Sequence, residues 1–136
     1  MAISTKIVMD SFEPGKAVHL ALATHMTPVC DCFGFTSLPI LPDAGIFGSD
    51  DIVAIDQAVL DMTAKTPLLE QNIPTSMEVA HHEGHPFAWL HGPYKDPYKV
   101  LEYGEALGLG SRTYELVDVL PVDDISPAGL GYVPAS

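Results

Sequence analysis

The sequence predicts a single α/β domain in which helices pack on a small mixed or parallel sheet. Two apolar runs of strand length, Ala17–Thr24 and Ala44–Gly48, lie on either side of a long loop and precede a well-marked helix start. The chain has 136 residues, which suits one domain, and 47% of them are hydrophobic, an ordinary fraction for a globular fold. We therefore expect one domain over residues 1–120 and an extended tail rich in Pro, Gly and Asp over residues 121–136.

The first half of the chain predicts a helix, a strand, a loop, a second strand and a second helix. Apolar residues at helical spacing predict a short N-terminal helix with one face made of Ile3, Ile7, Val8 and Phe12. The near-continuous apolar run of Ala17–Thr24 is typical of a central strand covered on both faces. After the second strand, Ser49 is expected to cap a helix that begins near Asp50 and ends near Lys65.

The second half of the chain is less regular. Residues 68–93 hold four of the six histidines and the only Trp among several Pro and Gly residues, which predicts a long loop with a functional or docking role. Asp96 and Pro97 mark the start of another helix, and Gly108 marks its end. Thr113–Leu120 alternates well enough to predict a final strand.

The charge of the chain limits its partners. The formal net charge is −12, from 18 acidic residues against 6 Lys and Arg. Such a surface repels phosphate backbones and anionic lipid headgroups, so neither nucleic acid nor membrane is expected as a partner. Cationic proteins or metal ions fit better, and colloidal solubility is the simpler explanation. With no signal peptide and only two cysteines, the expected location is cytoplasmic.

The two cysteines form a C-x-C motif. Cys30 and Cys32 flank Asp31 in a loop rich in turns and acids, so both thiols can approach one metal ion or act as redox thiols. A tetrahedral zinc or iron–sulfur site needs about four ligands, so the others would come from His25, from later histidines or from a second subunit. The alternative is two reduced thiols that pack like small apolar groups.

Carboxylates without basic partners lie around this loop. No Lys or Arg occurs between Lys16 and Lys65, and hard cations prefer the oxygen ligands that could come from Asp43, Asp50, Asp51 and Asp56. Their spacing matches no calcium loop, and Asp50 and Asp51 also suit a helix start. Asp43 lies at a turn before a strand, and it is the aspartate for which the sequence suggests a structural role least clearly.

A histidine cluster, H-H-E-G-H, comprises His81, His82, Glu83 and His85. The spacing differs from the H-E-x-x-H of zinc proteases, and Gly84 disfavours the helix that such a motif needs. A loop site for a transition metal using His81 or His82 with His85 is one interpretation, and it would allow a metal-dependent enzyme. Solvated or partner-facing histidines are the other interpretation.

Three motifs in the same order resemble one known family. The segments T-P-V-C-D-C-F-G-F, P-D-A-G-I-F-G-S-D-D-I-V-A-I-D-Q-A and L-E-Y-G-E-A-L-G-L-G-S-R-T-Y-E-L-V resemble the C-terminal part of domain-of-unknown-function family 362, over roughly Ala17–Val119. Members of that family are often described as iron–sulfur proteins. The resemblance marks as candidate site residues Cys30, Asp31, Cys32, Asp43 and Asp56.

The chain differs from the longer members in lacking the upstream half of the domain and the C-x-x-C-x-x-C cassette. The resemblance therefore implies a fragment or split member that forms a homo-oligomer or pairs with a polypeptide supplying the missing segments. Our leading hypothesis is a redox-associated domain, linked through the C-D-C loop to a transition metal or an iron–sulfur cluster. The alternative is a non-catalytic interaction domain that binds through Phe33, Phe35 and the Trp89 loop.

Overall fold

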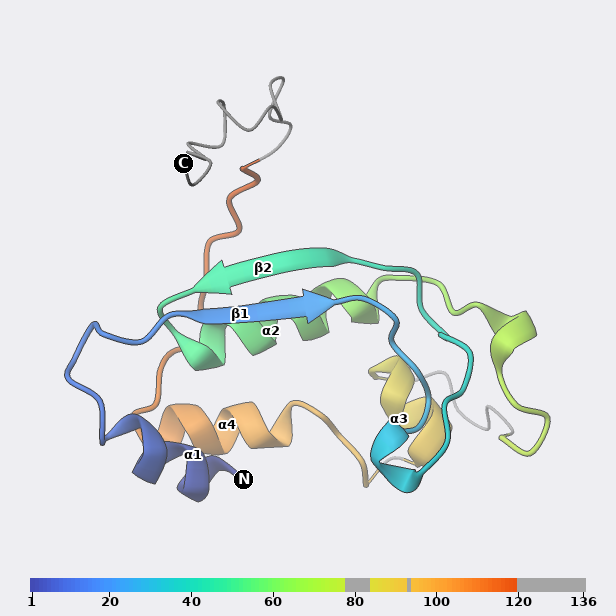
Figure 1. The fold of residues 1–136 in the computed structure, drawn as a ribbon, viewed down its shortest axis with the longest axis horizontal. Coiled ribbons are helices and arrows are strands. Elements are labelled where there is room, and N and C mark those ends of the chain that lie inside the picture. Colours follow the sequence, from blue (N-terminus) through green and yellow to red (C-terminus); the bar gives the residue numbers. More distant parts are fainter. Residues whose placement is uncertain (78–83, 93, 120–136) are drawn as a thin grey trace, which may run out of the picture.

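The structure is a computed structural model that describes residues 1–77, 84–92 and 94–119. Helices pack with a small two-stranded sheet, which confirms the predicted α/β class (Figure 1). The elements follow in the order α1 (Ala2–Met9), β1 (His19–Ala23), η1 (Asp31–Phe33), β2 (Gly45–Ser49), α2 (Ile52–Ala64), η2 (Glu70–Asn72), α3 (Pro86–His91) and α4 (Lys99–Ala106). The predicted tail, residues 121–136, lies outside the described residues.

The two strands pair antiparallel, with His19 opposite Ser49 and Ala23 opposite Gly45. Helix α2 packs against both strands and covers one face of the sheet, α4 packs on α2, and α1 packs on α4 (Figure 1). The other face of the sheet is open, because Leu20 and Leu22 are 71% and 64% exposed. The prediction that this strand is covered on both faces is therefore wrong.

Helix α2 begins two residues later than predicted, and its cap is Asp51 rather than Ser49. The Oδ1 atom of Asp51 accepts hydrogen bonds from the backbone N–H groups of Val53 at 2.8 Å and Ala54 at 2.9 Å. Ser49 instead accepts a hydrogen bond from the N–H of Asp51 through its hydroxyl. Both are residue types that favour caps, and the carboxylate accepts from two N–H groups of the first turn, whereas the hydroxyl accepts from the N–H of the cap residue alone.

The second half of the chain departs further from the prediction. The predicted loop contains the short helix α3, which His85 caps by accepting a hydrogen bond from the N–H of Phe87. The described part of the predicted final strand, residues 113–119, pairs with no strand. Helix α4 is confirmed, with Asp96 accepting a hydrogen bond from the N–H of Tyr98.

A polar network holds the C-terminal segment against α2. Asp61 accepts hydrogen bonds from the hydroxyls of Tyr98 at 3.1 Å and Tyr114 at 3.0 Å, and from the amide of Gln57 at 2.8 Å. Gln57 accepts in turn from Nε of Arg112 at 2.9 Å. These bonds, rather than a strand ladder, position residues 112–114.

The apolar core is small. In the described residues, the large aliphatic side chains that are buried are Ile40, Leu41, Val53, Ile55 and Leu101. Eighteen large apolar side chains in the same part of the chain are exposed, including the face of α1 and both Phe residues of the C-D-C loop. Exposed apolar residues that occur singly are ordinary, but contiguous groups of them mark interaction surfaces.

Candidate functional site

The C-D-C loop forms a single tight turn at the surface. Cys30 is the N-cap of η1 and accepts a hydrogen bond from the N–H of Cys32 through its sulfur, at 3.4 Å. Gly34 ends the turn with φ of 88°, a left-handed conformation that glycine adopts without strain. Both cysteines are exposed free thiols, so the predicted open turn is confirmed.

The electrostatics of this turn favour the protonated form of Cys32. The hydrogen bond with Cys30 raises the pKa of Cys32, and slight desolvation and the negative charges of Cys30 and Asp31 raise it further. The Cys30 thiol donates to the Asp31 carboxylate at 3.7 Å. Reactive cysteines usually lie beside positive charge, which lowers the thiol pKa. Metal binding here would therefore release protons from the pair.

A cavity of about 430 Å³ lies beside the thiols and is lined by His25, Met26, Thr27, Cys30, Asp31 and Thr36. His25 has a left-handed backbone with φ of 54°, which is uncommon for a residue with a side chain. Its N–H donates to Oδ1 of Asp43 at 2.8 Å, so Asp43 tethers the loop where the strand ends. His25 and Cys30 therefore line the same cavity, and Asp43 has a structural role.

The predicted ligands do not all converge. In residues 1–77, 84–92 and 94–119, no three His, Cys, Asp or Glu side chains lie close enough to hold one metal ion. Asp56 lies on α2 near His19 of β1. Desolvation raises the pKa of Asp56, and the charge of His19 lowers it. A metal at the C-D-C loop would need ligands from beyond the described side chains.

His85 is buried and has a structural role. Its Nδ1 accepts from the N–H of Phe87 at 3.1 Å, which places the ring proton on Nε2. Nε2 therefore donates to the hydroxyl of Thr63 at 2.9 Å, and that hydroxyl donates to the carbonyl of Val59. Burial lowers the pKa of His85, so the ring is neutral at pH 7. The other proposed ligands, His81, His82 and Glu83, lie outside the described residues.

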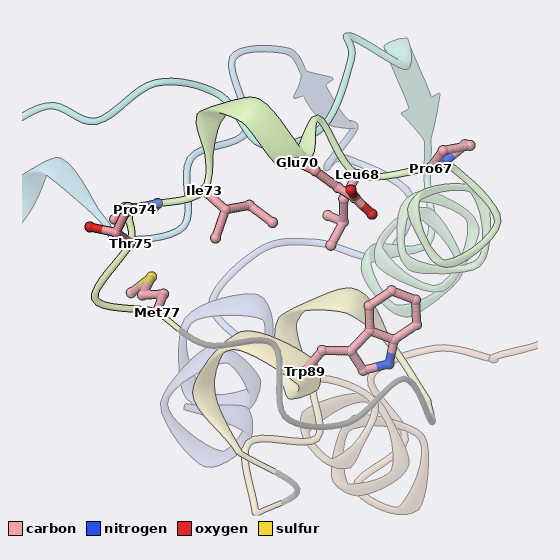
Figure 2. A pocket seen from close by; sticks show the side chains of 8 residues that line it. All are labelled: Pro67, Leu68, Glu70, Ile73, Pro74, Thr75, Met77 and Trp89. Atoms are coloured by element: carbon pink, nitrogen blue, oxygen red, sulfur yellow. The ribbon is translucent and has the colours of Figure 1, made fainter.

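A second cavity, of about 550 Å³, was not predicted from the sequence (Figure 2). It lies between the loop around η2 and helix α3, and its lining is mainly apolar: Pro67, Leu68, Glu70, Ile73, Pro74, Thr75, Met77 and Trp89. The sequence feature that could have indicated this cavity is the P-L-L-E-Q-N-I-P segment, residues 67–74, because its apolar residues belong to no predicted strand or long helix. Glu70 is the one lining residue that carries a charge.

The open face of the sheet is an apolar surface of the described residues. We define it as Val18, Leu20, Leu22 and Ile46, which are 74%, 71%, 64% and 71% exposed. Ile46 pairs with Leu22 across the strands, and Leu20 pairs with Gly48, so the strand residues share one side. No member of this face carries a charge.

Comparison of the chain with known protein families, with curated proteins and with solved structures found no match. The resemblance to family 362 therefore stays a prediction from the sequence motifs. Among the described helices, none has the length and apolarity needed to cross a membrane.

Proposed function

We propose that this chain is an interaction domain whose sheet is covered by a second polypeptide. The observation that supports this proposal is the open face of the sheet, whose four apolar side chains are each at least 64% exposed. A two-stranded sheet is marginally stable in isolation, and here α2 supports it on one face. Partner binding would complete it.

The free energy available at the open face is considerable. Fully burying a large aliphatic side chain contributes about 1.5–3 kcal/mol, so four partly exposed side chains offer several kcal/mol to an interface. In the described part of the chain, the outer edges of β1 and β2 pair with no further strand, so a partner can also add backbone hydrogen bonds there. This combination favours a polypeptide partner over a small ligand at this surface.

The charge of the chain favours a partner other than a second copy. Two copies would each bring a formal charge of −12 to the assembly, and the resulting repulsion opposes self-association. A neutral or basic polypeptide with an apolar strand meets no such penalty. The proposal includes a cytoplasmic location, where the thiols of Cys30 and Cys32 stay reduced.

Site-specific photo-crosslinking in cells tests this proposal. A photoreactive residue at Leu22 should crosslink to one polypeptide different from this chain, and Ile46→Lys should abolish the crosslink while circular dichroism shows an unchanged fold. A photoreactive residue at Val117, which is 67% exposed but outside the sheet, is the matched control. Equal crosslinking from Leu22 and Val117, or crosslinks only to a second copy, would refute the proposal.

A second candidate function rests on the exposed thiol pair. Cys30 and Cys32 would provide two ligands of a transition metal or an iron–sulfur cluster, which gives the chain a redox-associated role. The support for this candidate is the exposure of both thiols. His25 lines the same cavity as Cys30, but the two cysteines and His25 do not lie close enough together to hold one ion. The remaining ligands would come from the partner chain.

Elemental analysis and an absorbance spectrum of the protein purified anaerobically with its crosslinked partner test the second candidate. Cys30→Ser and Cys32→Ser should each lose the metal. Asp50→Asn, which changes an exposed acid on a different surface, should retain it. Equal metal content in all variants would exclude the cysteines as ligands.

A further inference from the structure

We propose that the cavity between η2 and α3 binds a small organic cation with an apolar body, such as an arylalkylammonium ion. This proposal is independent of the partner interaction and of the thiol pair. It rests on the shape, the lining and the fixed walls of the cavity, whose volume of about 550 Å³ is in the range of small-molecule sites.

The lining selects the chemistry of the ligand. In Figure 2 the side chains of Leu68 and Ile73 point from the loop into the cavity, and the indole of Trp89 rises from α3 on the opposite side. An indole face attracts a cation through its quadrupole, and apolar walls take the hydrocarbon body. Glu70 adds a carboxylate, and the described lining residues include no Lys, Arg or His. The charge of these residues therefore favours a cation over an anion.

Both walls of the cavity are anchored. The loop is fixed by a hydrogen bond from the N–H of Leu69 to the carbonyl of Ile40 at 2.8 Å, and by one from the amide of Asn72 to the carbonyl of Pro39 at 2.7 Å. Helix α3 is fixed through buried His85 at one end. At the other end, His91 Nε2 donates to the carbonyl of Pro28 at 2.7 Å. A site with fixed walls loses little conformational entropy when a ligand binds.

A small molecule fits these features better than a polypeptide. The cavity is bounded on two sides by separate segments and has one charged group, so it suits one cationic head and one apolar body. An extended peptide would instead need a row of backbone hydrogen-bond partners along a groove or strand edge. The acidic character of the whole chain also raises the local concentration of cations.

Trp89 is the only tryptophan, so intrinsic fluorescence reports on the cavity directly. The full chain is titrated with phenethylammonium and, separately, with the neutral analogue 2-phenylethanol, with excitation of the indole alone. We expect a saturable change with both probes and tighter binding of the ammonium ion. Calorimetric titration of the same pairs provides a measurement that does not depend on the indole.

The variant Glu70→Gln should weaken ammonium binding by about 1.5-fold to fivefold, the range of an exposed ion pair, and leave binding of the alcohol unchanged. Glu13→Gln removes the same charge from an exposed position after α1, so it is the matched control and should bind as the wild type does. Equal affinity for the two probes, or no saturable binding by either method, would overturn the proposal. So would binding of a lysine-containing peptide without binding of phenethylammonium.

Discussion

Among the four candidate cation ligands Asp43, Asp50, Asp51 and Asp56, replacement of Asp51 by Ala should destabilise the fold most. Its Oδ1 caps α2 through two backbone N–H groups, and its Oδ2 accepts from the N–H of Ser111 at 2.8 Å. One carboxylate therefore joins the start of α2 to the turn after α4, sixty positions away in sequence. Asp50, its neighbour, is exposed and makes a good control.

The magnitude follows from the two roles of this carboxylate. Loss of an N-cap costs about 0.5–2 kcal/mol. Loss of a hydrogen bond to a charged group costs about 1.5–3 kcal/mol, and partial exposure reduces it. We therefore expect Asp51→Ala to lower the free energy of unfolding by about 2–4 kcal/mol, a large part of the total stability of a small domain. Asp50→Ala should cost about 0.5 kcal/mol, the helix-dipole contribution alone.

Urea denaturation followed by circular dichroism measures these differences. Gly110 gives a second test, because a Cβ at that position would overlap the Asp51 carboxylate. Gly110→Ala should be costly in the wild type and nearly neutral in the Asp51→Ala background, which gives a coupling energy of about 0.5–3 kcal/mol in a double-mutant cycle. Additive effects of the two substitutions, or equal costs for Asp50→Ala and Asp51→Ala, would refute this reasoning.

Three further predictions concern other residues. Because burial lowers the pKa of His85, its contribution is complete above the unfolded value of 6.5 and is lost as pH falls below it. Urea midpoints at pH 7.5 and 5 should therefore differ more in the wild type than in His85→Asn, which keeps a capping side chain. Asp61→Ala should lower the free energy of unfolding by about 2–4 kcal/mol, and Tyr114→Phe should lower it by about 1 kcal/mol, both measured by urea unfolding curves. Equal losses for the two variants would contradict the role of Asp61 as a shared acceptor. Cys30→Ser and Cys32→Ser, both exposed, should change stability by less than about 0.5 kcal/mol, and a larger loss in thermal melts would show that the turn is structural.

Local sequence patterns predicted most of the regular structure. Both strands and helices α2 and α4 lie where apolar periodicity and turn residues placed them, within a few residues. The exposed position of both cysteines also followed from local composition, since a loop rich in Gly, Pro and Asp cannot bury its backbone. These features depend on interactions between residues that are close in sequence, so the sequence alone predicts them.

The errors arose where tertiary contacts decide the outcome. The apolar run of β1 predicted cover on both faces, but the described elements supply a layer for one face only. The alternation of Thr113–Leu120 predicted a strand, but hydrogen bonds from Ser111 to Asp51 and from Tyr114 to Asp61 hold this part of the chain against α2 instead. Helix α3 was missed because its stability comes from His85, whose partner Thr63 is 22 positions away. These contacts join residues that are far apart in sequence, so a pattern of neighbouring residues does not predict them.

The two sides of α2 differ in a way that bears on the function. On the side of α4 and the C-terminal segment, the polar atoms of Asp51, Gln57 and Asp61 are satisfied by residues more than 30 positions away. On the other side α2 meets a two-stranded sheet whose outer face is apolar and uncovered. In a poorly packed fold, we would expect unsatisfied polar atoms or exposed apolar side chains on both sides of α2. In the described residues, satisfied hydrogen bonds on one side and exposed aliphatic side chains on the other are the arrangement that the proposed partner interaction requires.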